Sequence, residues 1–390
     1  MQPESLPAVL SVHPVLDPGK LTQLTEESAR ELIRQGQSAN TRASYQGAMR
    51  YWAAWFAARY GQELKLPVPV PVVVQFIVDH AEREQVLEDA EEDAASAVPT
   101  GRKPRKKVAK KKAPLVFDLP PAVDQVLVAN GYKKKLGAYA QNTLVHRLAV
   151  LSKAHQNVNV DNPCNHTQVR ELIKNVRNGN AKRGVKPHKQ AALTKEPMEA
   201  LLATCDDSPR GKRDRALLLF AWASGGRRRS EVADATMENL RKIDSRGYLY
   251  RLGHSKTNQD GKENPDDAKP ISGRAAAAMD AWLEASRITE GPIFRRILKG
   301  GKVLDEPLDP TAVRKIVKRR CLQAGLPDDF SAHSLRSGFV TEAGRRKMDP
   351  ADAMAMTGHR HYETFMGYYR AEDPLDRKAS RLLDPDPAVE

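Results

Sequence analysis

The sequence predicts a mainly α-helical protein with two domains, in which a small antiparallel β-sheet accompanies the helices of the second domain. Three observations favour this class. The chain has 390 residues, more than one domain usually contains. Apolar residues recur at intervals of three and four along most of it, which is the spacing of a buried helix face. One stretch, Tyr248–Leu252, has the composition of a strand, and Lys269–Ser272 is predicted to return beside it as an edge strand.

The first domain is predicted to be helical over residues 21–180, after a flexible, proline-rich arm over residues 1–20. Within it, one helix is predicted to bury a face made of four residues spaced by three and four, namely Tyr45, Met49, Trp52 and Phe56. A further helix is predicted at Val72–Val86, after a cluster of prolines.

The net charge of +14 indicates a polyanionic partner, either a nucleic acid or an anionic membrane. The most apolar stretch, Val68–Val78, is short and contains two prolines, so no membrane-spanning segment is predicted. The N-terminus lacks an export signal, and the three cysteines are too scattered for a disulfide framework or a cysteine-based zinc site. We therefore expect a protein of the reduced cytoplasm.

A charged segment at residues 88–114 interrupts the helical pattern with an acidic cluster followed by a basic cluster. Because it has no apolar face, we predict a disordered insertion. Its bases would either contact nucleic-acid phosphates or form a solvated loop, and the sequence supports both interpretations equally.

A polar, basic stretch that contains Gly184 and Pro187 is predicted to be an interdomain linker over residues 181–192. The second domain is predicted at residues 193–372. A tail follows at residues 373–390, whose leucines have helical spacing. So short a helix needs a docking surface to be stable.

Three motifs of the second domain carry residues suited to chemistry on phosphate. In the first, His333 and Arg336 lie three residues apart, which places them on one face of a helix that begins near Ser331. A permanent cation, an imidazole and the unpaired N–H groups of a helix start would together bind an anion. The alternative is a surface histidine beside a surface arginine.

The second motif places three arginines, residues 227–229, directly after Gly225 and Gly226 at a predicted junction between two helices. Guanidinium groups there are well placed to bind phosphate oxygens. The alternative is a solvated basic turn, which would not need a pair of glycines.

The third motif contains two adjacent tyrosines, and the helical periodicity predicts different roles for them. Four residues with the spacing of a buried helix face are predicted to pack in the core: Tyr362, Phe365, Met366 and Tyr369. Tyr368 projects about 100° away from that face and is the candidate nucleophile. The nearby His359 and His361 do not favour a metal site, because no third ligand of suitable spacing is evident.

A lysine after the predicted strand is the candidate proton donor. Lys256 is one of three lysines in this turn-rich region, and Lys262 and Lys269 are not distinguished from it by sequence alone.

Taken together, these residues resemble the tyrosine recombinase (phage integrase) family in order and spacing over about 180 residues. The resemblance is carried by Arg228-x-x-Glu231, Lys256, His333-x-x-Arg336, Gly358-His359 and Tyr368 nine residues after His359. In addition, Ser38–Tyr45 with Trp52 and Trp55 is similar to the start of the family's helical core-binding domain, which has a SAM-like fold.

The resemblance implies a role for each matching residue. Arg228 and Arg336 would clamp the phosphate, with Glu231 supporting them. His333 and His359 would hydrogen-bond the phosphate and assist proton transfer. Lys256 would protonate the leaving 5′ oxygen, and Tyr368 would attack. No cofactor and no metal is implied.

The function implied by the resemblance is site-specific recombination through a 3′-phosphotyrosyl intermediate, in the integration, excision or resolution of a mobile element or replicon. The implied partners are double-stranded DNA with specific recombination sites, accessory proteins, and three further copies in a homo-tetramer with a dimer on each site. The tail over residues 373–390 would dock on a neighbouring subunit; the alternative is that it packs on its own domain. The alternatives are a non-catalytic DNA-binding regulator on the same scaffold and a DNA-relaxing enzyme of the type IB topoisomerase class.

Overall fold

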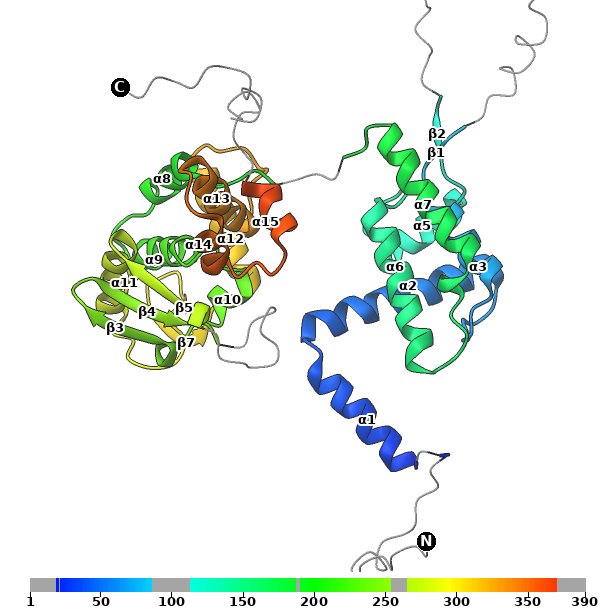
Figure 1. Ribbon diagram of the computed structural model, residues 1–390, viewed down its shortest axis with the longest axis horizontal. Helices are drawn as coiled ribbons and strands as arrows, with labels where there is room; N and C mark the ends of the chain where they lie inside the picture. The colour runs from blue at the N-terminus through cyan, green and yellow to red at the C-terminus, as the bar shows by residue number, and fades with distance from the viewer. Residues whose placement is uncertain (1–18, 21, 86–112, 187–189, 254–264, 370–390) are drawn as a thin grey trace, which may run out of the picture. The chain divides into compact units, whose positions relative to one another are not determined.

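The computed structural model describes five stretches of the chain: residues 19–20, 22–85, 113–186, 190–253 and 265–369. The chain divides into two compact units, residues 1–187 and 188–390. Helices dominate both units, and each small sheet is antiparallel (Figure 1). The predicted fold class is therefore confirmed. The arm up to residue 18, the insertion up to residue 112, Lys256 and the tail lie outside the described residues.

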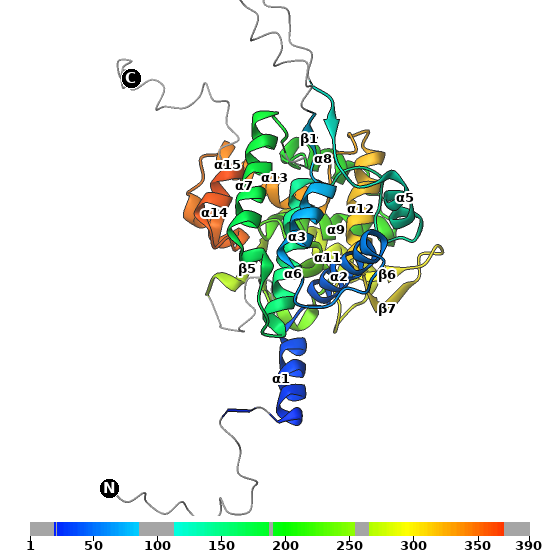
Figure 2. The ribbon, with the colours of Figure 1, turned by 90° about the vertical axis from the view of Figure 1, so that its right-hand side faces the viewer.

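The first unit is built from six helices among the described residues, and the elements are coloured blue to green in Figures 1 and 2. They are α1 (Gln23–Gly36), α2 (Ala39–Tyr60), α3 (Val70–His80), α5 (Pro121–Ala129), α6 (Gln141–Asn157) and α7 (Thr167–Lys182), with a 3-10 helix at Pro163–Asn165. The strands β1 (Arg83–Glu84) and β2 (Leu115–Val116) pair where the charged segment leaves and rejoins the unit.

The buried face of α2 differs from the predicted one by one position. Its fully buried aromatic residues are Tyr51, Trp52 and Trp55, and Trp52 stacks on Phe76 of α3 with the ring centroids 3.7 Å apart. The other three predicted residues, Tyr45, Met49 and Phe56, are only half-buried. The indole of Trp55 adds a reason for this rotation, because its Nε1 donates to the buried carboxylate of Asp79 at 2.8 Å.

Two predicted boundaries of the first unit also differ from the structure. The helix predicted at Val72–Val86 ends at His80, because the charged residues that follow turn into β1 and pair with β2. At the other end, α7 continues to Lys182, so the helix takes up the first part of the stretch that was predicted to be a linker.

The second unit begins with α8 and ends, among the described residues, with α15. Its helices are α8 (Lys195–Ala203), α9 (Pro209–Ala223), α10 (Arg229–Ala233), α11 (Arg274–Ser286), α12 (Pro310–Gln323), α13 (Ala332–Arg345), α14 (Pro350–Thr357) and α15 (Tyr362–Tyr369). Short 3-10 helices lie at Met237–Asn239 and Pro265–Asp267.

A three-stranded antiparallel sheet in the order β3-β4-β5 accompanies these helices. The strands are β3 (Leu240–Asp244), β4 (Gly247–Arg251) and β5 (Ala268–Ser272), with Tyr248 paired with Ile271. The two strands that the sequence predicted are β4 and β5, and β5 is an edge strand as expected. A separate hairpin of β6 (Arg295–Ile297) and β7 (Val303–Pro307) was not predicted.

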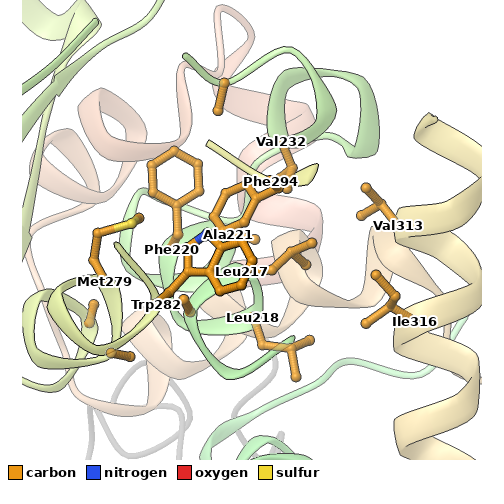
Figure 3. Packing of buried hydrophobic residues seen from close by; sticks show 14 of the residues in the cluster. Leu217, Leu218, Phe220, Ala221, Val232, Met279, Trp282, Phe294, Val313 and Ile316 are labelled. Atoms are coloured by element: carbon orange, nitrogen blue, oxygen red, sulfur yellow. The ribbon is translucent and has the colours of Figure 1, made fainter. Parts of the chain in front are cut away.

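The core of the second unit forms around α9. Figure 3 shows its Leu217, Phe220 and Ala221 in one cluster with Trp282 of α11 and Phe294. The indole of Trp282 satisfies its polar edge by donating to the carbonyl of Ile293 at 2.8 Å. This packing fixes the end of α9, from which the first candidate site residues emerge.

Neither a membrane span nor a metal cluster is found in the part of the chain that the structure describes. None of its helices is long and apolar enough to cross a membrane. It also contains no group of three or more His, Cys, Asp or Glu side chains arranged to hold a metal ion.

Candidate active site

The turn between α9 and α10 approaches two other helices at a distance that only glycine permits. Gly225 and Gly226 have φ values of +91° and +70°. A Cβ atom at Gly225 would lie 2.2 Å from the carbonyl oxygen of Met356, and one at Gly226 would lie 2.2 Å from Cα of Arg336. The paired glycines thus bring the arginine-rich turn against α13 and α14.

The three arginines after these glycines have different environments. Arg228 is the N-cap of α10, and its side chain is 29% exposed. Its Nη1 donates to Oε1 of Glu231 at 2.5 Å, and Oε2 of Glu231 accepts from its backbone N–H at 3.1 Å. Arg227 is buried, whereas Arg229 is exposed.

Glu231 is the anion that holds this turn together. Burial alone would raise the pKa of its carboxyl, but the guanidinium groups of Arg227 and Arg228 outweigh burial and lower the pKa below its usual value. Glu231 therefore stays ionised and fixes the direction of Arg228.

Helix α13 supplies the second motif, and it begins where the sequence predicted. Ser331 is its N-cap, and the hydroxyl of Ser331 accepts from the N–H of His333 at 3.3 Å. Arg336, one turn further on, is only 5% exposed. Its Nη1 donates to Gly226 O at 3.5 Å, while Nη2 has no hydrogen-bond partner among the described residues.

A buried guanidinium with an unpaired N–H is costly, and its electrostatics reflect this cost. Burial, followed by the nearby charges of Arg227 and Arg228, lowers the pKa of Arg336 to about 9. A nearby anion would offset both effects on this pKa, so an anionic group is a suitable partner for Arg336.

Helix α14 ends at Gly358, which has φ +67° and turns the chain towards His359. The hydroxyl of Thr357 donates to Ala353 O at 2.9 Å and lies 2.7 Å from Nδ1 of His359. The hydroxyl oxygen therefore accepts from Nδ1–H, which leaves Nε2 of the neutral ring without a proton. Burial, then Arg336 and Arg228, lower the pKa of His359 to about 4.

The two adjacent tyrosines of α15 direct their hydroxyl groups to different partners. The hydroxyl of Tyr368 lies 3.5 Å from Nε2 of His333, and their rings meet edge to face. Tyr369 instead packs against Phe365, and its hydroxyl donates to the carbonyl of Met348. Of the predicted stripe, only Phe365 is fully buried, whereas Met366 and Tyr369 are half-buried and pack against its cluster, as Tyr368 also does. The prediction for Tyr362 was wrong: it is 56% exposed, because it lies in the first turn of α15, before the helix reaches the buried cluster around Phe365.

One pocket of about 330 Å³ brings the motifs together. Five predicted site residues line it, namely Arg228, His333, Arg336, His359 and Tyr368. Glu231 lies behind Arg228, and Lys256 is outside the described residues. The sequence did not single out three further lining residues, Arg360, His361 and Thr364, for this role. Their position directly after Gly358-His359 was the available signal.

Comparison with known proteins finds a family model and curated relatives that resemble this chain in sequence. Residues 191–374 match the model of the phage integrase family. The chain is 29% identical over 206 residues to "Tyrosine recombinase XerC" of Halalkalibacterium halodurans, covering 50% of this chain and 62% of that protein. It is 30% identical over 207 residues to "Tyrosine recombinase XerD" of Neisseria meningitidis serogroup B, covering 50% and 64%.

Among solved structures, the fold is similar to a crystal structure of XerA recombinase, with a TM-score of 0.39, 13% identity and coverage of 69% of this chain and 84% of the other. It is also similar to the Tn1549 transposon integrase in complex with circular intermediate DNA, with a TM-score of 0.44, 15% identity and coverage of 62% and 79%.

The pocket lies on a mainly helical scaffold with a small sheet and gathers arginine, histidine and tyrosine side chains. Residues 191–374 form a domain that matches the phage integrase family, and both curated relatives described above are named tyrosine recombinases. The chain spans less than two thirds of the length of the two curated relatives described above.

Proposed function

We propose that this protein is a site-specific DNA recombinase, an enzyme that cuts and rejoins DNA through a 3′-phosphotyrosyl bond. The observation that carries the proposal is the position of Tyr368, whose hydroxyl lies in one pocket with His333 and the unpaired guanidinium N–H of Arg336. A buried cation whose Nη2 has no hydrogen-bond partner among the described residues, beside a nucleophile, suits an anionic ester as substrate.

The arginines would make the phosphodiester attackable. A phosphodiester carries negative charge and repels an anionic nucleophile, so Arg228 and Arg336 would neutralise it and stabilise the charge that builds on its oxygens during attack. Because Arg336 is buried, its interaction with the phosphate would be screened little by water. Glu231 would keep Arg228 in the direction that this contact needs.

Two proton transfers would accompany the attack. Burial, then Arg336 and Arg228, lower the pKa of His333, so its imidazole is neutral and can take the phenol proton from Tyr368. The bond from the tyrosine oxygen to phosphorus forms as the bond to the 5′ oxygen breaks. Lys256 would give a proton to that 5′ oxygen, as the family resemblance implies.

The covalent bond would conserve the energy of the broken linkage. A 5′-hydroxyl of a second DNA strand could then attack the phosphotyrosyl ester and release Tyr368, which gives rejoined DNA without an energy source. His359 would gain a proton once the anionic phosphate raises its pKa, and it would then donate to a phosphate oxygen.

The rest of the chain would serve the same reaction. We assign DNA binding to residues 21–180, catalysis to residues 193–372, and docking on a neighbouring subunit to residues 373–390, with four copies assembled on two double-stranded sites. The net charge of +14 supports a DNA partner. We propose the cytoplasm as the location, with the enzyme on DNA when active.

The decisive experiment traps the covalent intermediate. A pool of duplexes with randomised sequence, nicked near the centre so that the released fragment diffuses away, is incubated with the full chain and then denatured. Wild type should give a protein–DNA adduct with a free 5′-hydroxyl, and sequencing the attached DNA identifies the site. Tyr368→Phe should bind the same DNA and give no adduct.

Tyr369→Phe is the matched control, because the Tyr369 hydroxyl donates to a backbone carbonyl outside the pocket. It should keep the adduct. An adduct that persists in Tyr368→Phe and disappears in Tyr369→Phe would contradict the assignment. DNA binding without any adduct would identify a regulator, and relaxation of a supercoiled plasmid without strand exchange would identify a topoisomerase.

A further inference from the structure

Two buried cations lie behind the pocket without lining it. Arg227 is 3% exposed and Lys269 is 2% exposed, and neither belongs to the residues that surround the pocket. Arg227 lies in the turn between α9 and α10, and Lys269 lies in β5. Since burying a cation has a large desolvation cost, each needs specific partners to offset it.

Both cations bind the same end of the same helix. Nη2 of Arg227 donates to Met356 O at 2.7 Å, and Nζ of Lys269 donates to Ala355 O at 2.5 Å. These carbonyls belong to the last turn of α14, where helix geometry provides no N–H donor for them. A helix C-terminus also carries partial negative charge, so cations stabilise it.

The helix end that they hold carries part of the active site. Thr357, Gly358 and His359 follow directly, and the Thr357 hydroxyl orients the His359 ring. The carbonyl of Met356 is also the atom that a Cβ at Gly225 would meet at 2.2 Å. The end of α14 is therefore in close contact with the arginine-rich turn, and Arg227 joins the two.

The acidic groups near Arg227 and Lys269 do not fully compensate the two buried charges, which explains why backbone carbonyls also bind them. Arg227 has Glu231 at 3.7 Å, but Glu231 already pairs with Arg228 at 2.5 Å. Lys269 also donates to the carbonyl of Asp266, and the carboxylates of Asp266 and Asp267 act on it from the same turn. The carbonyls of α14 thus supply a share of the compensation that the acids do not.

We propose that Arg227 and Lys269 are positioning residues, which fix the last turn of α14 and thereby hold His359 against the substrate phosphate. The inference concerns the reaction proposed above and rests on it, but its structural part, the hold on His359, can be measured without DNA. A simple structural role would be to stabilise the fold as a whole, with no specific effect on His359.

The first test follows the His359 ring by NMR in the DNA-free protein, with isotope-labelled histidine. Arg227→Met and Lys269→Met should each shift its resonances, and Arg227→Met should raise its titration midpoint from about 4, because Arg227 is one of the charges that lower this pKa. Methionine removes the charge and keeps an unbranched, flexible side chain, while the carbonyls of α14 lose their donors.

Lys242→Met is the matched control. Lys242 lies on β3 of the same sheet, but its side chain is 58% exposed and pairs with Asp280. It should leave the His359 resonances unchanged. If the two buried variants fold and their His359 signals match those of the control, the proposal is wrong. Should either variant fail to fold, Arg227→Lys and Lys269→Arg keep the charge and change only its reach, and an unshifted His359 ring in both would equally refute it.

The second test is a double-mutant cycle on adduct formation. Lys269→Met should slow the appearance of the adduct by about 10- to 100-fold, the effect of misplacing a reacting group by about 1 Å. In a His359→Ala background it should cost little more, because the group that it positions is gone. Equal losses in both backgrounds would indicate general destabilisation. Absence of any adduct in wild type would contradict the proposed function, while the NMR result would still decide the hold on His359.

Discussion

Arg336 is the residue at which catalysis and stability should oppose each other. Its guanidinium is buried, and its Nη2 has no hydrogen-bond partner in the part of the chain that the structure describes. Burial, then the charges of Arg227 and Arg228, lower its pKa to about 9. Arg336→Met should therefore abolish the adduct and raise the melting temperature by about 2–4 °C, which corresponds to about 1 kcal/mol in a domain of this size. Calorimetry and the trapping assay measure the two effects.

Replacing Arg320 should change the stability in the opposite direction, although Arg320 is as buried as Arg336. Both arginines are 5% exposed, but Arg320 donates to Asp214 at 2.7 Å and to Thr204 O at 2.6 Å. Arg320→Met should lower stability by about 1 kcal/mol or more, because it removes a donor from a buried carboxylate. If Arg336→Met were destabilised as much as Arg320→Met, Arg336 would have partners that stabilise its charge.

His359 should make the folded state sensitive to acid. The unfolded ring takes up a proton near its ordinary pKa of 6.5, whereas the folded ring does so only near 4. Between these values unfolding binds a proton, so stability falls as the pH is lowered through this window. The melting temperature of the wild type should drop as the pH is lowered from about 6.5 to about 4, and that of His359→Asn should drop less. An equal drop in the variant would show that His359 contributes nothing to this dependence.

At the scale of elements, the close packing of the α9–α10 turn is testable at Gly226. A Cβ there would meet the backbone of Arg336 at 2.2 Å, so Gly226→Ala should displace α10 from α13 and abolish the adduct as well as lower stability. Gly301→Ala is the matched control, since Gly301 has φ +86° but nothing within 4 Å of an added Cβ. This variant should lose only about 1–2 kcal/mol of stability, which is the cost of placing alanine in a left-handed conformation.

Urea unfolding and the trapping assay compare the two glycine variants. Gly226→Ala should be the less stable variant and should be inactive, whereas Gly301→Ala should retain the adduct. Equal stability, with activity kept in both, would mean that α10 has room to move away from α13.

The elements that sequence predicted correctly are those with a strong local signal. Ser331 caps α13 because its hydroxyl accepts from the helix start, and Tyr248 with its β-prone neighbours lies in β4. In contrast, β3 has four exposed residues after Leu240, so it has no alternating pattern to reveal it. On α2, Tyr51 was missed because tertiary packing against α3, and not local spacing, chooses the buried face.

Some residues of the candidate site were likewise predictable from the sequence, and others were not. The roles of Arg228, Arg336 and Tyr368 rest on motif spacing, and the structure brings these three side chains to one pocket. The burial of Arg227 and Lys269 has no sequence signal, because neighbouring residues in a basic turn look alike until the fold determines which one points inward. For this reason the positioning pair emerges only from the carbonyls that it binds.

At the scale of the whole molecule, the last prediction concerns the tail. The apolar residues Leu375, Ala379, Leu382 and Leu383 have helical spacing in a segment too short to be stable alone, so we propose that a neighbouring subunit supplies its docking surface. Deleting residues 372–390 should leave binding to a single DNA site unchanged, because the tail lies beyond both proposed DNA-contacting regions.

The same deletion should impair recombination between two sites, because Tyr368 lies four residues before the deleted segment and its placement would then lose the coupling to assembly. Gel shifts on one site and a two-site recombination assay measure the two steps. A matched variant with Leu375, Ala379, Leu382 and Leu383 each replaced by serine keeps the length and the charge of the tail. It should behave like the deletion, since burial of these side chains is what docking requires. Full recombination by both variants would place the subunit contacts elsewhere in the chain.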